Sequence, residues 1–275
     1  MINWDLLKKK VVEVKPMFGV LFGCSGSGKS SALGTTGLTT LVVHGPTENH
    51  AATNAKTRAE DPSLITGLDY TVYAEDGKVN FNASYKNLLT ILRDPGVAEA
   101  FEVVALDSLT ELQSIVAGTT QFTDLITNDK GKINKFHEGD AYLKLMGEVI
   151  NALLNLQQKG VHVFATCAAV IKSQDETGEA VEAKPMLQGF SVGDGIARSF
   201  SDVLFVNLLR TEEGPKHTFL FQPTLGMASK DLNGKVSKMS FANFTPRLSY
   251  YLRDQLPETA DVDLGKIIKA RKARA

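Results

Sequence analysis

The feature that most constrains the fold is a loop at residues 23–30, GCSGSGKS, which fits the pattern G-x-x-x-x-G-K-[ST] and directly follows a strand-like run at residues 17–22. A phosphate-binding loop requires this strand-to-loop context. Its small residues let consecutive backbone N–H groups turn towards a phosphate, and a helix that begins near Lys29 presents the positive end of its dipole to the same anion. We predict that Lys29 binds the β- and γ-phosphates of ATP and that the Ser30 hydroxyl binds Mg²⁺. The predicted nucleotide-binding residues are Gly23, Cys24, Ser25, Gly26, Ser27, Gly28, Lys29, Ser30 and Ser31.

Composition sets bounds on the rest of the chain. Its 275 residues, 43% of them hydrophobic, are enough for one large domain with a buried core or for two small ones. A formal net charge of −1 gives no overall basic surface, so any contact with nucleic acid must come from local clusters. The cysteines, Cys24 and Cys167, lack metal-ligand spacing, and neither a signal-peptide pattern nor a membrane-length apolar run is present. We therefore expect a cytoplasmic protein without disulfides and without a membrane partner.

Strand-like and helix-like segments alternate along the sequence. The strand-like runs are residues 17–22, 38–44, 101–107, 161–166, 202–208 and 217–222, and the helical patterns are residues 31–36, 49–62, 85–92 and 140–160. The last helix is predicted to run from an Asp140 cap to a Gly160 stop. Such alternation predicts an α/β fold with a doubly wound, mainly parallel sheet. An Asp-Gly turn within residues 70–81 predicts a β-hairpin insertion at an edge.

A second motif lies at residues 101–108. This run is apolar up to Leu106 and then ends in Asp107-Ser108, as expected of a strand that is buried on both faces of a parallel sheet. A carboxylate at the carboxyl end of such a strand can orient a water molecule in the Mg²⁺ shell, which is the Walker-B role. Apolar runs that end in Asp are common, but the combination with the phosphate-binding loop is specific.

The chain is predicted to have three parts. Residues 1–15 form an amphipathic N-terminal arm, expected to pack on its own domain or on a neighbouring subunit, and residues 16–255 form the ATPase core. Residues 256–275 form a basic tail that we expect to be disordered. Its cationic residues are Lys266, Lys269, Arg271, Lys272 and Arg274.

The apolar run that ends in Asp107-Ser108 resembles the Walker-B strand of RecA-type ATPases, whereas most AAA+ proteins have Asp-Glu there. The order of parts over residues 16–222 is similar to that of phage-encoded RecA-like nucleotide-binding proteins, some of which are single-strand annealing recombinases. This resemblance implies a RecA-like P-loop fold, Mg²⁺-dependent ATP hydrolysis, and a role in DNA recombination, repair or replication. It also implies single-stranded DNA as a partner, a homo-oligomeric ring or filament, and the host cytoplasm as the location if the chain is phage-encoded.

The resemblance also assigns roles near the nucleotide. In RecA-type enzymes the glutamate that activates the attacking water follows the second strand, which implies Glu48 here. The alternative is an exposed Glu that caps the next helix. The γ-phosphate sensor, often Gln in the family, corresponds to Thr166-Cys167, a departure from the family pattern. Arg210 and Lys216 resemble the basic finger that a neighbouring subunit supplies, although surface Arg and Lys are commonly just solvated.

The family's two DNA-binding loops correspond to residues 119–139, predicted to be a long mobile loop, and 168–190, with a hairpin tip at 175–179. An equally open interpretation is that both are ordinary solvated connections. The residues implied to contact DNA phosphates are Lys130, Lys132, Lys135, Lys172 and Lys184, and Phe190 is implied to stack on a base.

Two other functions remain open. A small-molecule kinase would need a lid rich in arginine, but Arg93 is the only arginine between Arg58 and Arg198. A nucleotide-switched phage assembly factor would bind ATP without being an enzyme.

Overall fold

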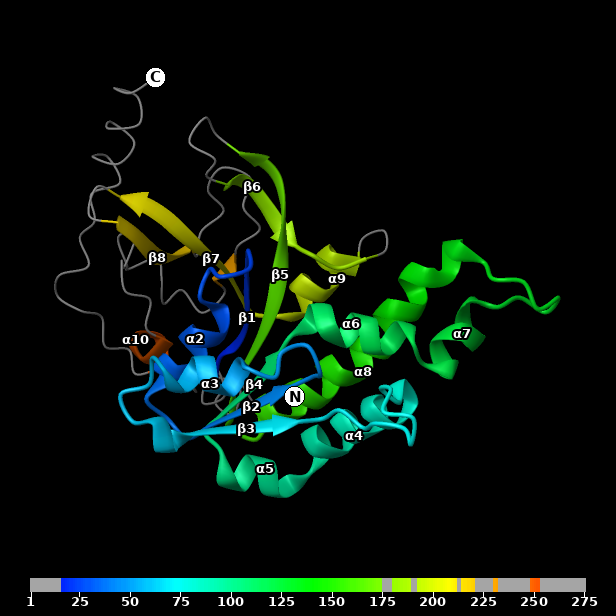
Figure 1. Cartoon of the computed structure of the whole chain (residues 1–275), viewed down its shortest axis with the longest axis horizontal. Coiled ribbons are helices and arrows are strands. Elements are labelled where there is room, and N and C mark those ends of the chain that lie inside the picture. The colour runs from blue at the N-terminus through cyan, green and yellow to red at the C-terminus, as the bar shows by residue number, and fades with distance from the viewer. Residues whose placement is uncertain are drawn as a thin grey trace, which may run out of the picture.

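The computed structural model describes residues 16–174, 180–188, 192–211, 214–220, 230–231 and 248–252. Within these residues a nine-stranded sheet has the order β3-β2-β4-β5-β1-β7-β8, with β6 paired to β5 and β9 to β7 (Figure 1). The strands are β1 Phe18–Gly23, β2 Thr40–His44, β3 Ile65–Asp69, β4 Val103–Asp107, β5 His162–Gln174, β6 Ala180–Pro185, β7 Asp202–Thr211, β8 Gly214–Leu220 and β9 Lys230–Asp231. The α-helices are α2 Lys29–Leu33, α3 Ala51–Lys56, α4 Phe81–Arg93, α5 Pro95–Ala100, α6 Leu109–Ala117, α7 Thr120–Ile126, α8 Glu138–Gln158, α9 Val192–Ser199 and α10 Leu248–Leu252. Short 3₁₀ helices are η1 Gly34–Thr36, η2 Pro62–Leu64 and η3 Lys135–His137.

The sheet is mainly parallel and doubly wound, as predicted. Strand β1 pairs in parallel with β5 and β7, and β2 pairs in parallel with β3 and β4. Strand β5 lies between β1, which precedes the phosphate-binding loop, and β4, which ends in Asp107. This order is that of the RecA-like P-loop fold. The parallel strands read as continuous apolar runs because both of their faces are covered.

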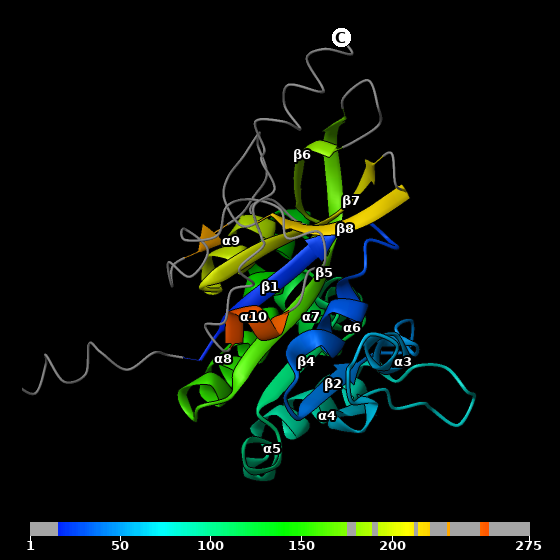
Figure 2. The ribbon, with the colours of Figure 1, turned by 90° about the vertical axis from the view of Figure 1, so that its left-hand side faces the viewer.

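Helices cover both faces of the sheet. One core packs α4, α6, α7, α8 and α9 on one face, and a second core packs α2, α3 and α10 on the other. In Figure 1 α2, α3 and α10 lie to the left of β5, and α6, α7 and α8 to its right. In Figure 2 the face with α2, α3 and α10 is turned towards the viewer. The carboxyl ends of the parallel strands therefore meet at one edge of the sheet, between the two helical layers.

Helix α8 confirms the predicted helical stripe on the sheet. Its residues at helical spacing, among them Tyr142 and Leu153, are buried, and Gly160 ends the helix region with a φ of 97° that favours glycine. The predicted Asp140 cap is wrong, because the helix already begins at Glu138, and Asp140 lies within its first turn. An acidic residue there interacts favourably with the helix dipole without capping the helix.

Three further segments differ from the prediction. Strand β3 was not predicted, because Ile65 is its only buried residue and Gly67 interrupts its sequence. Its presence makes the Walker-B strand the fourth in chain order rather than the third. The hairpin expected within residues 70–81 is reduced to one antiparallel bridge, between Tyr73 and Val79, around the predicted Asp-Gly turn.

The prediction of a long loop without regular structure at residues 119–139 is wrong. Thr119 caps α7 through a hydrogen bond from the Phe122 N–H to its hydroxyl, and the Phe122 ring packs on Tyr142 of α8 with 4.5 Å between ring centroids. An antiparallel bridge between Thr127 and Ile133 then closes a tight turn before η3. Only two side chains of α7 are buried. Two apolar positions are too few to produce a recognisable helical period in the sequence.

The stretch after the fourth predicted strand is also ordered, because β5 continues to Gln174 and pairs antiparallel with β6. This pairing confirms a β-hairpin there. Several predicted features lie outside the described residues: the arm 1–15, the hairpin tip 175–179, Phe190 and the tail 256–275. The predicted division of the chain near residues 15 and 255 stays a prediction. None of the described helices is long and apolar enough to cross a membrane.

Candidate nucleotide-binding site

The loop at residues 23–30 connects β1 to α2, as its motif predicts. Gly28 caps α2 with a φ of 95°, and a Cβ at Gly23 would lie 2.3 Å from the carbonyl oxygen of Val206, so both positions require glycine. The Lys29 ammonium donates hydrogen bonds to the carbonyl oxygens of Gly23 at 2.9 Å and Cys24 at 3.0 Å, which places it over the loop. Burial lowers the pKa of Lys29, and the charges of Asp107 and Glu48 oppose that shift.

Asp107 lies at the carboxyl end of β4 and is only 1% exposed. The Thr166 hydroxyl, on the neighbouring strand β5, donates a hydrogen bond to its Oδ1. Its Oδ2 is buried and has no hydrogen-bond partner among the residues that the structure describes. A buried carboxylate oxygen without a partner is costly, and the hydration shell of a cation would supply the missing donors.

Mg²⁺ fits this arrangement. The described ranges contain no group of three or more His, Cys, Asp and Glu residues that would hold a metal by themselves. In ATPase sites Mg²⁺ keeps several waters and is bound through one or two protein groups together with phosphates. Ser30 and Asp107 would therefore be the protein groups that hold it, with the nucleotide and water supplying the remaining ligands.

Glu48 lies half-buried in the connection between β2 and α3. Burial raises its pKa, and the negative charges of Asp107 and Glu111 raise it further, while Lys29 and a hydrogen bond from the Ser108 side chain lower it. The structure thus brings the three predicted catalytic residues, Lys29, Glu48 and Asp107, into electrostatic contact from three different strand ends. A carboxylate with a raised pKa beside a phosphate-binding lysine is a suitable acceptor for a proton from water.

The sequence did not reveal the role of Glu111. Ser108 caps α6 and accepts a hydrogen bond from the Glu111 N–H at 3.2 Å, so the two residues fit the capping-box pattern S-x-x-E. In that pattern the glutamate would reach back to its own cap. Here its Oε1 instead accepts a hydrogen bond from the Thr47 N–H, at 2.6 Å, next to Glu48.

The predicted sensor position is occupied by Thr166 and Cys167. The Thr166 hydroxyl is used by Asp107, and the Cys167 thiol is buried near the Thr110 hydroxyl, 3.4 Å away. Burial raises the pKa of Cys167 to about 11, so the thiol stays protonated at neutral pH. Thr166 therefore orients Asp107, and neither residue extends a long polar side chain as the Gln of RecA-type enzymes would.

The lysines predicted to bind DNA lie in two places. Lys130, Lys132 and Lys135 are exposed on the turn between α7 and α8, and Lys172 and Lys184 are exposed on β5 and β6. Sequence reasoning missed Phe136, which is 94% exposed on the same turn as the first three lysines.

The backbones of Arg210 and Lys216 lie on β7 and β8, where these strands pair, but their side chains are not described. Their role as a basic finger stays a prediction.

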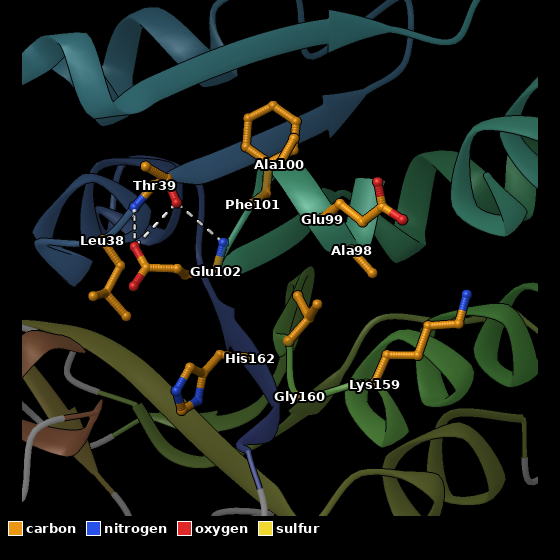
Figure 3. A pocket seen from close by; sticks show the side chains of 11 residues that line it. Leu38, Thr39, Ala98, Glu99, Ala100, Phe101, Glu102, Lys159, Gly160 and His162 are labelled. Carbon is orange, nitrogen blue, oxygen red and sulfur yellow. Dashed lines mark hydrogen bonds between the residues drawn. The ribbon is translucent and has the colours of Figure 1, made fainter. Parts of the chain in front are cut away.

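A separate pocket of about 300 Å³ lies at the amino ends of β2, β4 and β5 (Figure 3). Two of its polar residues pair with each other, since the Glu102 carboxylate accepts hydrogen bonds from the Thr39 N–H and hydroxyl, both at 3.0 Å. At the pocket wall His162 Nδ1 accepts a hydrogen bond from the Met17 N–H at 3.0 Å. The phosphate-binding loop follows the carboxyl end of β1, so this pocket lies at the opposite edge and contributes nothing to the nucleotide site.

The fold and the site define a P-loop nucleotide-binding protein. Residues 15–232 match a family model described as an AAA domain, so the chain belongs to this family of AAA domains. The predicted class, a P-loop ATPase, is confirmed, while a phage origin and membership of a recombinase family stay predictions. Comparison with curated proteins found no match. Among solved structures, the chain is similar to the flagellar accessory protein FlaH from Methanocaldococcus jannaschii, with 11% identity and a TM-score of 0.43 over 85% of this chain and 88% of that chain.

Proposed function

We propose that the protein hydrolyses ATP. The observation that carries this proposal is the meeting of Lys29, Asp107 and Glu48 at one edge of the sheet. Lys29 binds the β- and γ-phosphates. Ser30 and Asp107 would hold Mg²⁺, which would neutralise phosphate charge. Glu48 orients a water molecule whose oxygen forms a bond to the γ-phosphorus while the bond to the β–γ bridging oxygen breaks. The water proton passes to the Glu48 carboxylate, and ADP and phosphate leave.

An assay of ADP release with and without single-stranded DNA tests this proposal. Turnover in ATP and Mg²⁺ alone is the expected result, because the proton acceptor and the cationic groups belong to the same chain. ADP release that depends on an added acceptor would indicate a small-molecule kinase instead. Tight binding of ATP without turnover would indicate a nucleotide-switched assembly factor.

Replacement of the Walker-B acid tests the Mg²⁺ site. Asp107→Asn is expected to lower Mg²⁺-dependent turnover by about 10- to 100-fold. The amide keeps the shape and can still accept the hydrogen bond from Thr166, but it lacks the charge that orients the Mg²⁺ shell. Initial rates measured across a range of Mg²⁺ concentrations, with the exposed α7 variant Asp124→Asn as control, report the effect. A titration curve unchanged from wild type would argue against this assignment.

We further propose that the protein binds single-stranded DNA, with a role in recombination, repair or replication, through the turn at residues 128–137. Phe136 and Ile133 are 94% and 63% exposed, and the three lysines of this turn all lie within six residues before Phe136. An exposed aromatic ring next to cations suits a nucleic-acid strand, because bases stack on the ring and phosphates pair with the lysines. The turn projects beyond α7 in Figure 1.

The backbone of this turn is held by its own side chains. The Asn128 carboxamide oxygen accepts hydrogen bonds from the Lys130 and Lys132 N–H groups, each at 3.0 Å, and that of Asn134 accepts one from the Phe136 N–H at 3.1 Å. A preformed turn loses less conformational entropy on binding. With a net charge of −1 for the chain, we propose that such weak contacts add up around a homo-oligomer.

Two variants test this surface. Replacing Lys130, Lys132 and Lys135 together by Ala is expected to weaken single-strand binding and to flatten its dependence on salt, because fewer counterions are released. Phe136→Ala is expected to weaken binding about 5- to 100-fold without changing the salt slope, because only stacking is lost. The matched control replaces the exposed Lys56, Lys86 and Lys159 by Ala, which changes the net charge equally. If both triple variants lose the same affinity for single strands, the attraction depends on net charge and not on this turn. If the wild-type protein does not bind single strands at low salt, the DNA proposal is wrong.

A further inference from the structure

Glu111 is a buried carboxylate that the proposed hydrolysis does not use. It lies in the first turn of α6, directly after the Walker-B residues, and is only 7% exposed. Its Oε1 accepts a hydrogen bond from the Thr47 N–H at 2.6 Å, a short distance typical of a charge-assisted bond. Thr47 precedes Glu48, so this bond joins the helix that begins beside Asp107 to the connection that carries the predicted base.

The second oxygen of Glu111 faces a different part of the same connection. A Cβ at Gly45 would lie 2.8 Å from Glu111 Oε2 and 2.7 Å from the Tyr70 hydroxyl, so only glycine allows this close packing. Both of these polar atoms are buried and without a hydrogen-bond partner within the described ranges. A buried carboxylate with so few donors is costly, and such groups in native proteins call for an explanation.

Two simpler roles do not account for Glu111. As a helix cap, its carboxylate would reach back to Ser108, but both of its oxygens face the connection at residues 45–48. As the base itself, it would need an oxygen directed at the attacking water. One oxygen is bound to Thr47 and the other lies against Gly45 and Tyr70, so neither is placed for that task.

We propose that Glu111 is a positioning residue that fixes Glu48 relative to the Mg²⁺ and phosphate groups, an inference that rests on the proposed ATP hydrolysis. Ser108, next to Asp107, caps helix α6, so the hydrogen bond that Glu111 accepts from the Thr47 N–H sets the position of the base with respect to the Walker-B acid. Positioning within about 1 Å is known to decide rates by up to ~100-fold.

Three substitutions separate the reach of the side chain from its charge. Glu111→Gln keeps the length, and its amide oxygen can still accept from the Thr47 N–H. Glu111→Asp keeps the charge but is one methylene too short, and Glu111→Ala loses both. We expect kcat to fall about 10- to 100-fold in the Asp and Ala variants and less than about 5-fold in the Gln variant. The KM for ATP should stay within about 3-fold in all three, because Lys29 and the phosphate-binding loop are untouched.

The measurements are steady-state kcat and KM together with thermal unfolding, and the control is Glu99→Ala, an exposed residue of α5 at the opposite edge of the sheet (Figure 3). Higher activity in the Asp variant than in the Gln variant would show that charge, not reach, matters, and would overturn the proposal. Equal activity in all variants would overturn it as well. The absence of ATP turnover in wild type would remove the proposed function and this inference together, whereas wild-type turnover with the reversed order removes the inference alone.

Discussion

Lys29→Ala is expected to lower ATP turnover by about 10³-fold and to weaken binding of ATP strongly, because the loop loses its cation for the β- and γ-phosphates. The Lys29 ammonium lies over the loop, within hydrogen-bond distance of Gly23 O and Cys24 O, where phosphate oxygens would compete for it. The effect on AMP, which lacks those phosphates, should be much smaller. A direct titration with ATP, ADP and AMP therefore reports where the lysine acts.

The matched control is Lys86→Ala, an exposed lysine on α4. We expect the thermal midpoint of Lys29→Ala to change little, because losing two hydrogen bonds is offset by removing a buried ammonium whose pKa burial has already lowered. An unchanged midpoint would show that a loss of activity does not come from unfolding. Retention of wild-type turnover would refute the assignment of the loop.

The phosphate-binding loop and the Walker-B strand were predictable because each motif consists of consecutive residues. Strand β4 is buried along its whole length, so its sequence is continuously apolar up to Leu106, and the acid Asp107 marks its carboxyl end. Strand β3 escaped prediction because an edge strand with four exposed residues needs no apolar run. Helix α7 escaped because two buried side chains and a Thr119 cap suffice to form it.

The contacts that position the site were not predictable from local patterns. Thr166 and Asp107 are 59 residues apart, and Glu111 and Thr47 are 64 residues apart, so each pair meets only because the sheet order places their elements together. The capping-box pattern at Ser108 and Glu111 even favours a local interpretation. The Glu111 carboxylate instead accepts a hydrogen bond from a backbone N–H of the connection at residues 45–48. The sequence pattern does not show that this connection lies nearby.

Glu48→Gln is expected to preserve ATP binding while lowering turnover by about 10³-fold. The amide keeps the shape of the carboxylate, but it cannot accept a proton from water. Loss of a negative charge close to Lys29 leaves more of the lysine's positive potential for the phosphates, so ATP affinity should be equal to or tighter than that of wild type. Single-turnover ADP formation and equilibrium binding of a fluorescent ATP analogue measure the two effects separately.

The pH dependence adds a second readout of the same residue. Burial and the charges of Asp107 and Glu111 raise the pKa of Glu48. As the pH is lowered, wild-type turnover should therefore begin to fall at a pH above the usual glutamate range, because the base becomes protonated. In Glu48→Gln the residual rate should lack this acid limb. The matched control is Glu60→Gln, an exposed glutamate after α3. Normal turnover in Glu48→Gln together with a loss in Glu60→Gln would move the base to the other acid, and an unchanged acid limb in Glu48→Gln would assign that titration to another group.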